Sequence, residues 1–457
     1  MSNLITTWQP EDKTFWAKKG RFVARQNLWL SVPALLLSCA VWYVWCVTLT
    51  YVPNIGFKYS NEELYTLAGL PALSGATLRI FYSFAVPIFG GRRWTALSTA
   101  SLLIPLVGLG FAVQDPSTPY WQMQLWALLC GFGSANFSSS MSNISFFFPK
   151  SEKGAALGVN AGLGNLGVSV VQFVVPVVVT MSMFALGAEA QTFTKGSEVK
   201  QIWLQNAAFL WVPFVVLSSI AAWFGMHDLA SAKASFKEQA IIFKRKHTWI
   251  LCWLYLGTFG SFIGFAAGFG LLMKGQFPEV NATQYVFLGA LIGALSRVIG
   301  GKLADKLGAA RVTTFVFLGM IVTVLGVIHF LPNNGMGGSF NGFFACFIAL
   351  FALTGVGNAS TFAQVPKIYS SVQQRLASKD TSPAQVEANA NKEAAATLGF
   401  SAAIGAYGGF VVPKSYGISV AATGGVEAAL IMFIVFYISC VIVNWWFYSR
   451  KNAETPC

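Results

Sequence analysis

Two arginines, Arg79 and Arg297, lie in the middle of long apolar runs, in the segments LRIFYSF and SRVIGG. An arginine at the centre of a bilayer costs at least about 2.5 to 3.5 kcal/mol. All 17 Asp and Glu residues map to predicted loops, termini or helix edges, so we expect no buried carboxylate beside either guanidinium. A guanidinium stays protonated and presents planar, paired donors that suit an oxyanion. We therefore expect the two arginines to bind one small anion; the alternative is that each snorkels or bonds backbone carbonyls.

The composition places these arginines in a membrane protein. The chain has 457 residues, of which 55% are hydrophobic and only 10% are charged, and its mean hydropathy is +0.59. A soluble domain averages about 25% charged residues. Apolar runs of about 20 residues, rather than alternating ten-residue segments, favour helices over a β-barrel. Six of the seven cysteines fall inside apolar runs without metal-ligand spacing, so we expect small buried side chains and no metal or cofactor.

Twelve apolar runs are long enough to cross a bilayer, which predicts an all-α membrane protein with 12 transmembrane helices. The predicted spans are 28 to 52, 64 to 86, 94 to 113, 120 to 147, 154 to 182, 203 to 225, 248 to 273, 284 to 304, 312 to 331, 341 to 366, 395 to 418 and 423 to 448. Most of the 30 Lys and Arg residues fall on the side of the termini, which the positive-inside rule makes cytoplasmic. The basic charge is thus an orientation signal, and it indicates no nucleic-acid partner.

The spans fall into two halves of six. We expect a cytoplasmic N-terminal segment (1–26), a first six-helix bundle (27–225), a cytoplasmic linker (226–247), a second bundle (248–448) and a cytoplasmic tail (449–457). The stretch 370–396 has amphipathic patterning and is expected to lie on the cytoplasmic surface. The three histidines lie near span ends, where we expect solvated roles: His227, His247 and His329.

An internal repeat relates the halves. Arg79 and Arg297 are each followed eleven residues later by a glycine, Gly90 or Gly308. The segment LGVNAGLGNLG (157–167) matches LGFSAAIGAYG (398–408), and GFGSA (131–135) matches GVGNA (355–359), in the same order in both halves. Six plus six helices from parallel repeats is an architecture that alternates access by rocking one half against the other.

The segment GGKLADKLGAARVT (300–313) resembles the signature of the major facilitator superfamily between the second and third helices of a half. In this inner-gate motif Asp305 would accept backbone N–H groups at a neighbouring helix start, and Arg311 would pair with a carboxylate. The first-half copy, FGGRRWT (89–95), lacks the Asp, so an Asp-centred latch is expected in one half only. The alternative is that these charges simply end the helices.

The paired arginines and the two glycine-rich runs, together with SSSMSNISFFFPK and YLGTFGSFIGF, resemble the nitrate/nitrite porter family of that superfamily, especially its bacterial exchangers, over nearly the whole chain. The resemblance implies that Arg79 and Arg297 bind the anion's oxygens, that Tyr255 and Asn165 donate further hydrogen bonds, and that Phe137 and Phe259 sandwich its plane. Interhelical hydrogen bonding for Tyr255 and Asn165, and core packing for the phenylalanines, are the alternatives.

The glycines of the fifth and eleventh spans recur at three- and four-residue spacings, which permit close helix contact. The resemblance implies that they also let helices slide or bend; static packing is the alternative. They are Gly158, Gly162, Gly164, Gly167, Gly399, Gly405, Gly408 and Gly409.

Two like charges would repel each other when a poorly solvated cleft closes, and a bound anion would offset that repulsion. We therefore expect obligatory exchange of nitrate for nitrite, with nitrate entering and nitrite leaving a bacterial cell through its inner membrane. Proton-coupled nitrate uptake is the alternative within transport, and a small-anion channel or a non-transporting anion sensor is an alternative of another class. We expect no enzyme, because the sequence offers no cluster of a nucleophile, an acid and a base. The resemblance further implies a monomer.

Overall fold

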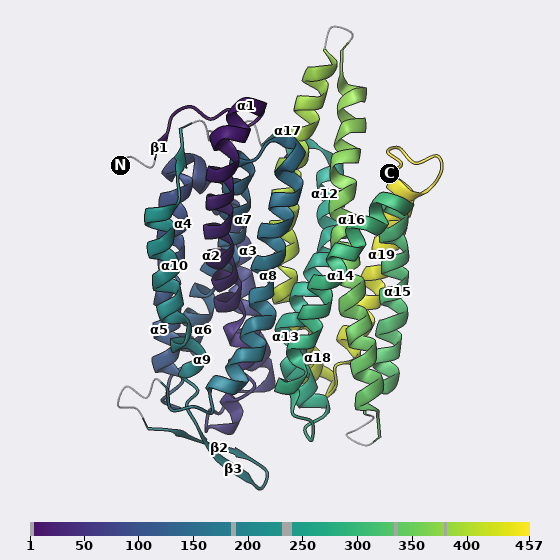
Figure 1. The fold of residues 1–457 in the computed structure, drawn as a ribbon. Coiled ribbons are helices and arrows are strands. Elements are labelled where there is room, and N and C mark those ends of the chain that lie inside the picture. Colours follow the sequence, from purple (N-terminus) through teal and green to yellow (C-terminus); the bar gives the residue numbers. More distant parts are fainter. Residues whose placement is uncertain (1–3, 184–188, 231–239, 333–336, 379–381) are drawn as a thin grey trace. The chain divides into compact units, whose positions relative to one another are not determined.

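The computed structural model describes residues 4–183, 189–230, 240–332, 337–378 and 382–457, and most of them are helical (Figure 1). The chain forms two compact units. The first unit comprises Met1–Ala234, Phe269–Leu271 and Asn281–Phe287; the second comprises Ser235–Gly268, Leu272–Val280 and Leu288–Cys457. The main boundary between the two units falls within the predicted linker 226–247. Residues 231–239 of that linker lie outside the described part of the chain.

The first unit is built from long helices with short breaks. Its elements are β1 (Leu4–Ile5), α1 (Lys13–Phe15), η1 (Trp16–Gly20), α2 (Arg21–Thr48), η2 (Val52–Asn54), α3 (Asn61–Phe89), α4 (Gly91–Ala100), α5 (Leu103–Ala112), α6 (Tyr120–Leu129), α7 (Gly131–Phe147), α8 (Lys150–Val178), β2 (Gln191–Lys195), β3 (Glu198–Ile202), α9 (Asn206–Phe209), α10 (Trp211–Gly225) and β4 (Asp228–Leu229). Strand β1 pairs in parallel with β4, and β2 pairs antiparallel with β3.

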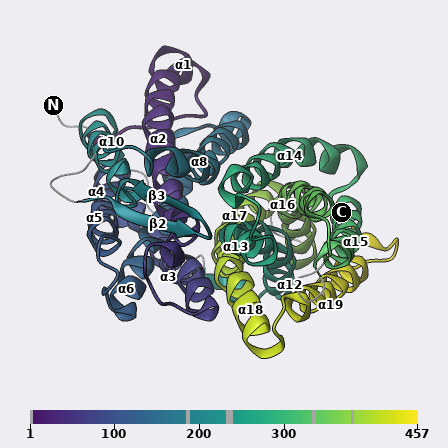
Figure 2. The ribbon, with the colours of Figure 1, turned by 90° about the horizontal axis from the view of Figure 1, so that it is seen from below.

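The rest of the chain is also helical. Its elements are η3 (Ala240–Lys244), α12 (Lys246–Tyr255), η4 (Leu256–Gly260), α13 (Ser261–Gln276), η5 (Ala282–Gln284), α14 (Val286–Leu307), α15 (Ala309–Phe330), α16 (Phe340–Leu376), α17 (Pro383–Ala406), α18 (Gly408–Thr423), α19 (Glu427–Asn444) and η6 (Trp445–Ser449). Figure 2 looks along the helices of each unit, and shows α15 beside α19 in the second.

Within the described residues, eleven helices are long and apolar enough to cross a membrane. They coincide with eleven of the twelve predicted spans. The remaining one, 120 to 147, consists of α6 and α7, which follow each other with Cys130 between them. The polar side chains of the run SSSMSN in α7 lower the hydropathy of this segment. Four of them, Ser138, Ser139, Ser140 and Asn143, are buried inside the unit.

One expectation about the polar ends of the helices is wrong, and another stays a prediction. Most of the described residues of 370–396 belong to the end of α16, which continues to Leu376, and to the first part of α17, which begins at Pro383, so their position on the cytoplasmic surface stays a prediction. At 37 residues, α16 is about 55 Å long, well beyond the roughly 30 Å of a bilayer core. His247 is not solvated but buried, and its Nδ1 lies 3.0 Å from the Tyr448 hydroxyl, since α12 and η6 bring the two rings together.

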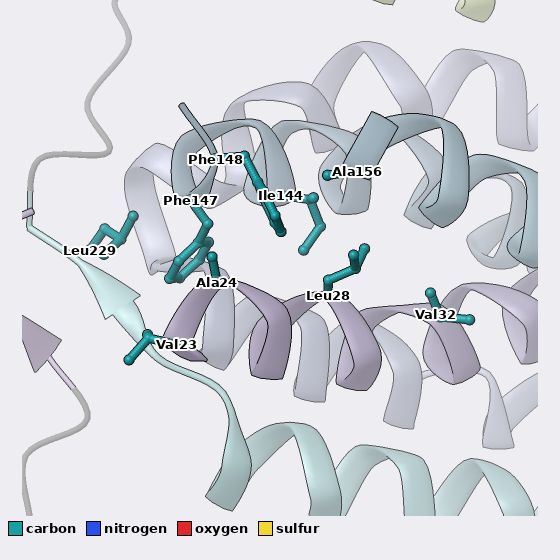
Figure 3. Packing of buried hydrophobic residues seen from close by; sticks show 9 residues of the cluster. All are labelled: Val23, Ala24, Leu28, Val32, Ile144, Phe147, Phe148, Ala156 and Leu229. Atoms are coloured by element: carbon teal, nitrogen blue, oxygen red, sulfur yellow. The ribbon is translucent and has the colours of Figure 1, made fainter. Parts of the chain in front are cut away.

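One apolar cluster shows how the first unit is assembled. Residues of α2, among them Val23 and Leu28, pack against Ile144 and Phe147 at the end of α7 and Ala156 in α8 (Figure 3).

Large apolar side chains are also exposed, such as Phe22 and Phe224, each with 75% of its surface accessible. Exposed apolar side chains over long helices are what a lipid-facing surface requires.

The internal repeat is present in the backbone of both units. Gly90 precedes α4 with φ of 88°, and Gly308 precedes α15 with φ of 90°, a left-handed conformation that favours glycine. A Cβ added to Gly131 would meet the α3 backbone at Gly75, and a Cβ added to Gly355 would meet the α14 backbone at Gly293. The same pair of helices is therefore in close contact in each unit, one turn before each arginine.

Candidate functional site

Arg79 is enclosed by the first unit. Only 1% of its surface is exposed, and its Nε donates a hydrogen bond of 3.1 Å to the carbonyl oxygen of Ser134 on α7. Its guanidinium carbon lies 5.4 Å from the Trp42 ring centroid and 5.1 Å from that of Phe137, distances at which a cation is attracted to an aromatic ring. The contact to Ser134 fixes the plane of the guanidinium, and it depends on Gly75, where a side chain would clash with Ser134.

Asn165 approaches the same region from α8. It is partly buried, and its Oδ1 lies 4.0 Å from the sulfur of Cys39 on α2, at the limit for a thiol donor. The structure thus brings together Arg79 and Phe137. Asn165 contacts Cys39 on α2, the helix that also carries Trp42 of the Arg79 group.

Arg297 has a different environment in the second unit. Its side chain is half-buried, and the guanidinium carbon lies 5.4 Å from the centroid of the Phe362 ring on α16. Phe362 contacts Tyr255 at 4.7 Å between centroids, and Tyr255 stacks on Phe259 at 5.0 Å with an interplanar angle of 18°. Within the described residues, no carboxylate forms an ion pair with Arg297. Phe362 therefore connects the arginine to the two predicted aromatic residues.

Two residues of these groups, Trp42 and Phe362, were not predicted from the sequence. Ser134 was predicted only as one of the small polar residues 134–143 that could line a pore, and it also lies in the repeated segment GFGSA. Trp42 belongs to the aromatic run WYVW, which looks like ordinary core. Nothing in the sequence marks Phe362 as a site residue, because a phenylalanine in an apolar helix is normally a packing residue. Only its contact with Arg297 distinguishes it.

Four of the eight predicted glycines pack closely. A Cβ on Gly167 would clash with the carbonyl of Leu36, and one on Gly408 would clash with Gly260. A Cβ on Gly164 would lie 2.6 Å from the Leu35 side chain, whereas one on Gly405 would lie 3.0 Å from both Tyr255 and Phe259. The glycine at 405 therefore leaves room for the two aromatic residues of the second unit.

The other four glycines differ. Gly158, Gly162 and Gly399 are exposed, and a Cβ built on any of them meets nothing within 4 Å in this structure. Gly409 is buried in α18. Close packing thus explains Gly164, Gly167, Gly405 and Gly408, but it does not explain the three exposed glycines. Their expected role in helix movement stays a prediction.

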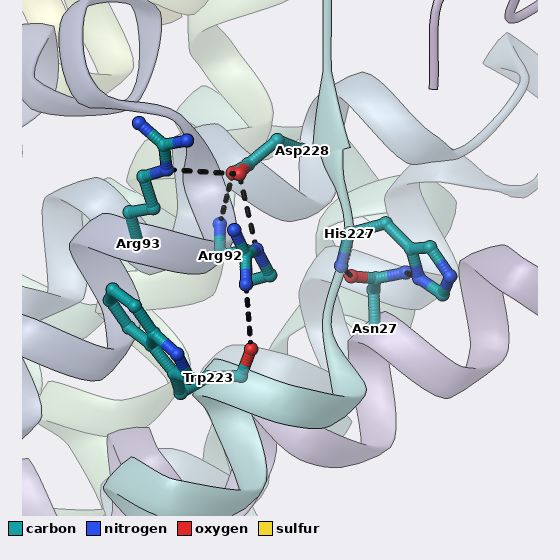
Figure 4. Close-up of polar contacts among 6 residues, drawn as sticks. All are labelled: Asn27, Arg92, Arg93, Trp223, His227 and Asp228. Carbon is teal, nitrogen blue, oxygen red and sulfur yellow. Dashed lines mark hydrogen bonds and ion pairs between the residues drawn. The ribbon is translucent and has the colours of Figure 1, made fainter. Parts of the chain in front are cut away.

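The first-half copy of the signature, FGGRRWT (89–95), lacks an Asp of its own, but a carboxylate from a distant part of the chain lies beside it. Asp228 in β4 accepts hydrogen bonds from the backbone N–H of Arg92 (2.8 Å) and from its Nε (3.2 Å), and its Oδ2 lies 3.9 Å from Nε of Arg93 (Figure 4). A Cβ on Gly90 would lie 2.5 Å from the Asp228 carboxylate. The carboxylate therefore satisfies the start of α4, where cations and unpaired N–H groups favour an anion.

The second unit caps the matching helix in another way. The N–H of Ala310 donates to the main-chain oxygen of Cys457 at 3.1 Å, while Asp305 and Arg311 are both exposed. Neither of these two side chains forms an ion pair with a residue that the structure describes. The predicted gate contacts, of Asp305 with backbone N–H groups and of Arg311 with a carboxylate, stay predictions. The cap by an acidic side chain is found in the half whose signature lacks the Asp.

The comparisons with known proteins agree with this architecture. The family model described as Major Facilitator Superfamily matches residues 31–413. The nitrate/nitrite transporter NarU of Salmonella typhimurium is 47% identical over 455 residues, 99% of this chain and 97% of that protein. The probable nitrate/nitrite antiporter NarK2 of Thermus thermophilus is 41% identical over 459 residues, 99% of this chain and 98% of that protein.

Solved structures show the same fold. A bacterial homologue of the human lysosomal transporter Spinster, in an inward-facing and occupied conformation, aligns with a TM-score of 0.65. The alignment covers 92% of this chain and 95% of that one at 13% identity. At this identity the likeness shows a shared fold, but it does not indicate a shared substrate.

Proposed function

The chain belongs to the major facilitator superfamily and, within it, to the nitrate/nitrite transporters, and from this premise we propose that it exchanges nitrate for nitrite by alternating access. It is a multi-pass membrane transporter and not an enzyme. We further propose that it lies in a bacterial cytoplasmic membrane with both termini in the cytoplasm, as the distribution of its Lys and Arg residues predicts.

One observation carries this proposal: each unit has an arginine at the matching position, with its guanidinium over an aromatic ring. Arg79 lies over Phe137 and Trp42, and Arg297 lies over Phe362. Nitrate and nitrite are flat, singly charged and weakly hydrated. Planar N–H donors can bind their oxygens edge-on, while aromatic faces cover the plane and keep water away.

In the proposed site, Arg79 and Arg297 bind the oxygens of one anion. Asn165 and Tyr255 donate further hydrogen bonds, and Phe137 and Phe259 cover the two faces of the anion. The stacking of Tyr255 on Phe259 supports the idea that both aromatic residues act as one surface. The anchoring of Arg79 by Ser134 supports a fixed donor geometry, which lowers the cost of ordering the side chain on binding.

Exchange follows from the charges. Two permanent cations repel each other when the halves close around a site with little water, and a bound anion offsets that repulsion. The loaded protein then crosses between its inward-facing and outward-facing states far more readily than the empty one. One monovalent anion must return for each one that enters, so the exchange is electroneutral.

Purified protein in liposomes tests this proposal. We expect uptake of isotopically labelled nitrate only when the vesicles contain nitrite or nitrate, with no effect of a pH gradient. Nitrate uptake into anion-free vesicles, driven by acid outside, would indicate proton-coupled uptake instead of exchange. Currents independent of a counter-anion would indicate a channel, and binding without flux would indicate a sensor; each of these results would overturn the proposal.

A further inference from the structure

The first unit contains a small polar cavity that is separate from the Arg79 group. It lies between α2, α4 and α7, and most of its lining residues are polar. They are Ser31, Ser38, Thr95, Ser98, Thr99, Asn136, Ser139 and Ser140, and the rest of the lining is Ala34 and Leu35. Neither Arg79 nor the aromatic rings beside it belong to this wall. Polar cavities inside proteins usually hold water, whereas apolar ones stay empty.

The hydrogen bonds of Asn136 fix which end of its amide is the nitrogen and which is the oxygen. Its Nδ2 donates to the Ser38 hydroxyl at 2.9 Å and to the Ser98 carbonyl at 3.2 Å. The Ser38 hydroxyl gives its own hydrogen to the Ala34 carbonyl at 2.8 Å, so towards Asn136 it can only accept. Both neighbours of Nδ2 are thus acceptors, and exchanging the amide nitrogen and oxygen would break both bonds.

The remaining amide oxygen needs a donor. Asn136 is 5% exposed, and its Oδ1 has no hydrogen-bond partner among the described residues. A buried acceptor without a partner costs about 1 to 3 kcal/mol, so such groups are normally paired with protein or with ordered water. Asn136 lines a cavity whose other polar lining residues are serines and threonines, so a water in that cavity could supply the missing donor.

The matching region of the second unit has no need of such a ligand. Ser98 and Thr99 follow Gly90 by eight and nine residues; Val316 and Phe317 follow Gly308 by the same distances. Val316 is 3% exposed, and Phe317 is fully buried against the Tyr437 ring.

The polar groups of that region bond to one another. The Thr313 hydroxyl lies 2.8 Å from the hydroxyl of Ser360, and it accepts a hydrogen bond of 2.7 Å from Nε2 of Gln364. Where the first unit has small hydroxyl residues around a space, the second has apolar side chains and direct hydrogen bonds.

We propose that the first unit permanently binds a water molecule in this cavity. The water donates to Oδ1 of Asn136 and bonds to the surrounding hydroxyls, Thr99 among them, and the cavity has room for about one water. An anion is disfavoured because it would face the lone pairs of the amide oxygen. A dehydrated cation is disfavoured because the wall contains no charged ligand to replace its hydration. This inference is independent of the transported substrate.

A double-mutant cycle on the detergent-purified protein tests the water site. Thr99→Ile removes a hydroxyl and fills the space of the water, and Asn136→Leu removes the acceptor while keeping the side-chain shape. In the wild-type background we expect Thr99→Ile to displace the water, leave Oδ1 of Asn136 without a hydrogen-bond donor and lower Tm by about 3 °C. In the Asn136→Leu background there is no amide oxygen left to lose its partner, so we expect the same change to raise Tm or leave it unchanged.

The change of sign between the two backgrounds is the result that supports bound water. A rise of Tm in both backgrounds would mean a dry void, and an equal fall in both would mean overpacking; either contradicts the proposal. Val316→Ile, which adds a methylene group to the tightly packed matching region of the second unit, is the control and should lower Tm equally in both backgrounds.

A second measurement remains decisive if Asn136→Leu does not fold. In a high-resolution structure of the wild-type protein, we expect water density about 3 Å from Oδ1 of Asn136. Empty density, or an Asn136 side chain turned to a protein donor, would overturn the proposal.

Discussion

The two units place an arginine at the same point of the same backbone arrangement but surround it differently. In the first, Arg79 is almost fully buried and is held by Ser134, Trp42 and Phe137. In the second, Arg297 is half-buried and contacts Phe362. Glycine contacts that set the distance between helices occur in both units, whereas side chains at matching positions differ. Backbone packing therefore determines where the charge lies, and the local side chains determine how firmly it is held.

This comparison leads to a first prediction, with the largest effect. Replacing Arg79 or Arg297 by Lys keeps the charge but removes the planar, paired donors. We expect each change to reduce nitrate exchange in liposomes by roughly 10- to 100-fold, with Arg79→Lys the more severe because Lys cannot reproduce the anchored geometry. Arg25→Lys, an exposed position, is the control and should be neutral. Near-normal exchange in both site variants would refute the role of the arginines.

The glycines provide a second prediction. Gly167→Ala and Gly408→Ala create backbone clashes in the first and second unit, so we expect each to destabilise the protein by about 1 to 3 kcal/mol. Gly158→Ala and Gly399→Ala point into open space and should leave Tm unchanged or raise it. Thermal unfolding of the four purified variants measures this. If the second pair keeps its Tm but loses exchange, those glycines serve movement; full exchange would remove that role.

The two helix caps provide a third prediction. Asp228→Ala removes the carboxylate that caps α4, and we expect it to destabilise the protein by about 1 to 2 kcal/mol. Cys457→Ser leaves the capping group of α15 in place, because that cap is a main-chain oxygen, and we expect almost no change. Equal losses of Tm in the two variants would contradict this difference between the units.

The smallest expected effect concerns His227, beside the Asp228 cap. Burial, reinforced by the charges of Lys19 and Arg92, lowers the pKa of His227 below its ordinary 6.5. Its Nδ1 lies 3.2 Å from Nδ2 of Asn27, whose Oδ1 accepts the backbone N–H of His227, so the ring nitrogen is the acceptor in the neutral form.

The unfolded chain therefore takes up the proton first. The stability from neutral His227 is fully present above pH 6.5, and it is lost as the pH falls through the lower pKa of the folded protein. We expect Tm to fall slightly from pH 7 to pH 5, and the fall to be smaller in His227→Gln. The same pH dependence in both proteins would assign it to other groups.

The sequence predicted features that depend on local pattern. Apolar length located the spans, and the spacing from Arg79 to Gly90 and from Arg297 to Gly308 located the repeat, because residues at fixed distances along a helix occupy fixed positions. It could not predict that Asp228 caps α4, because the two are far apart in the chain. The break between α6 and α7 and the burial of His247 likewise depend on neighbouring helices rather than on local sequence.

The candidate site was predicted unevenly for the same reason. A charge in an apolar run is conspicuous, so both arginines were found from the sequence alone, whereas Tyr255, Asn165, Phe137 and Phe259 came from the family resemblance. Phe362 and Trp42 are aromatic residues among many, and only their position over a guanidinium identifies them.

A structure determined with bound nitrate tests the central claim most directly. We expect planar density for one anion within about 3 Å of both guanidinium groups, of Arg79 and of Arg297. A nitrate bound to one arginine alone, or arginines neutralised by carboxylates of the protein, would contradict the account.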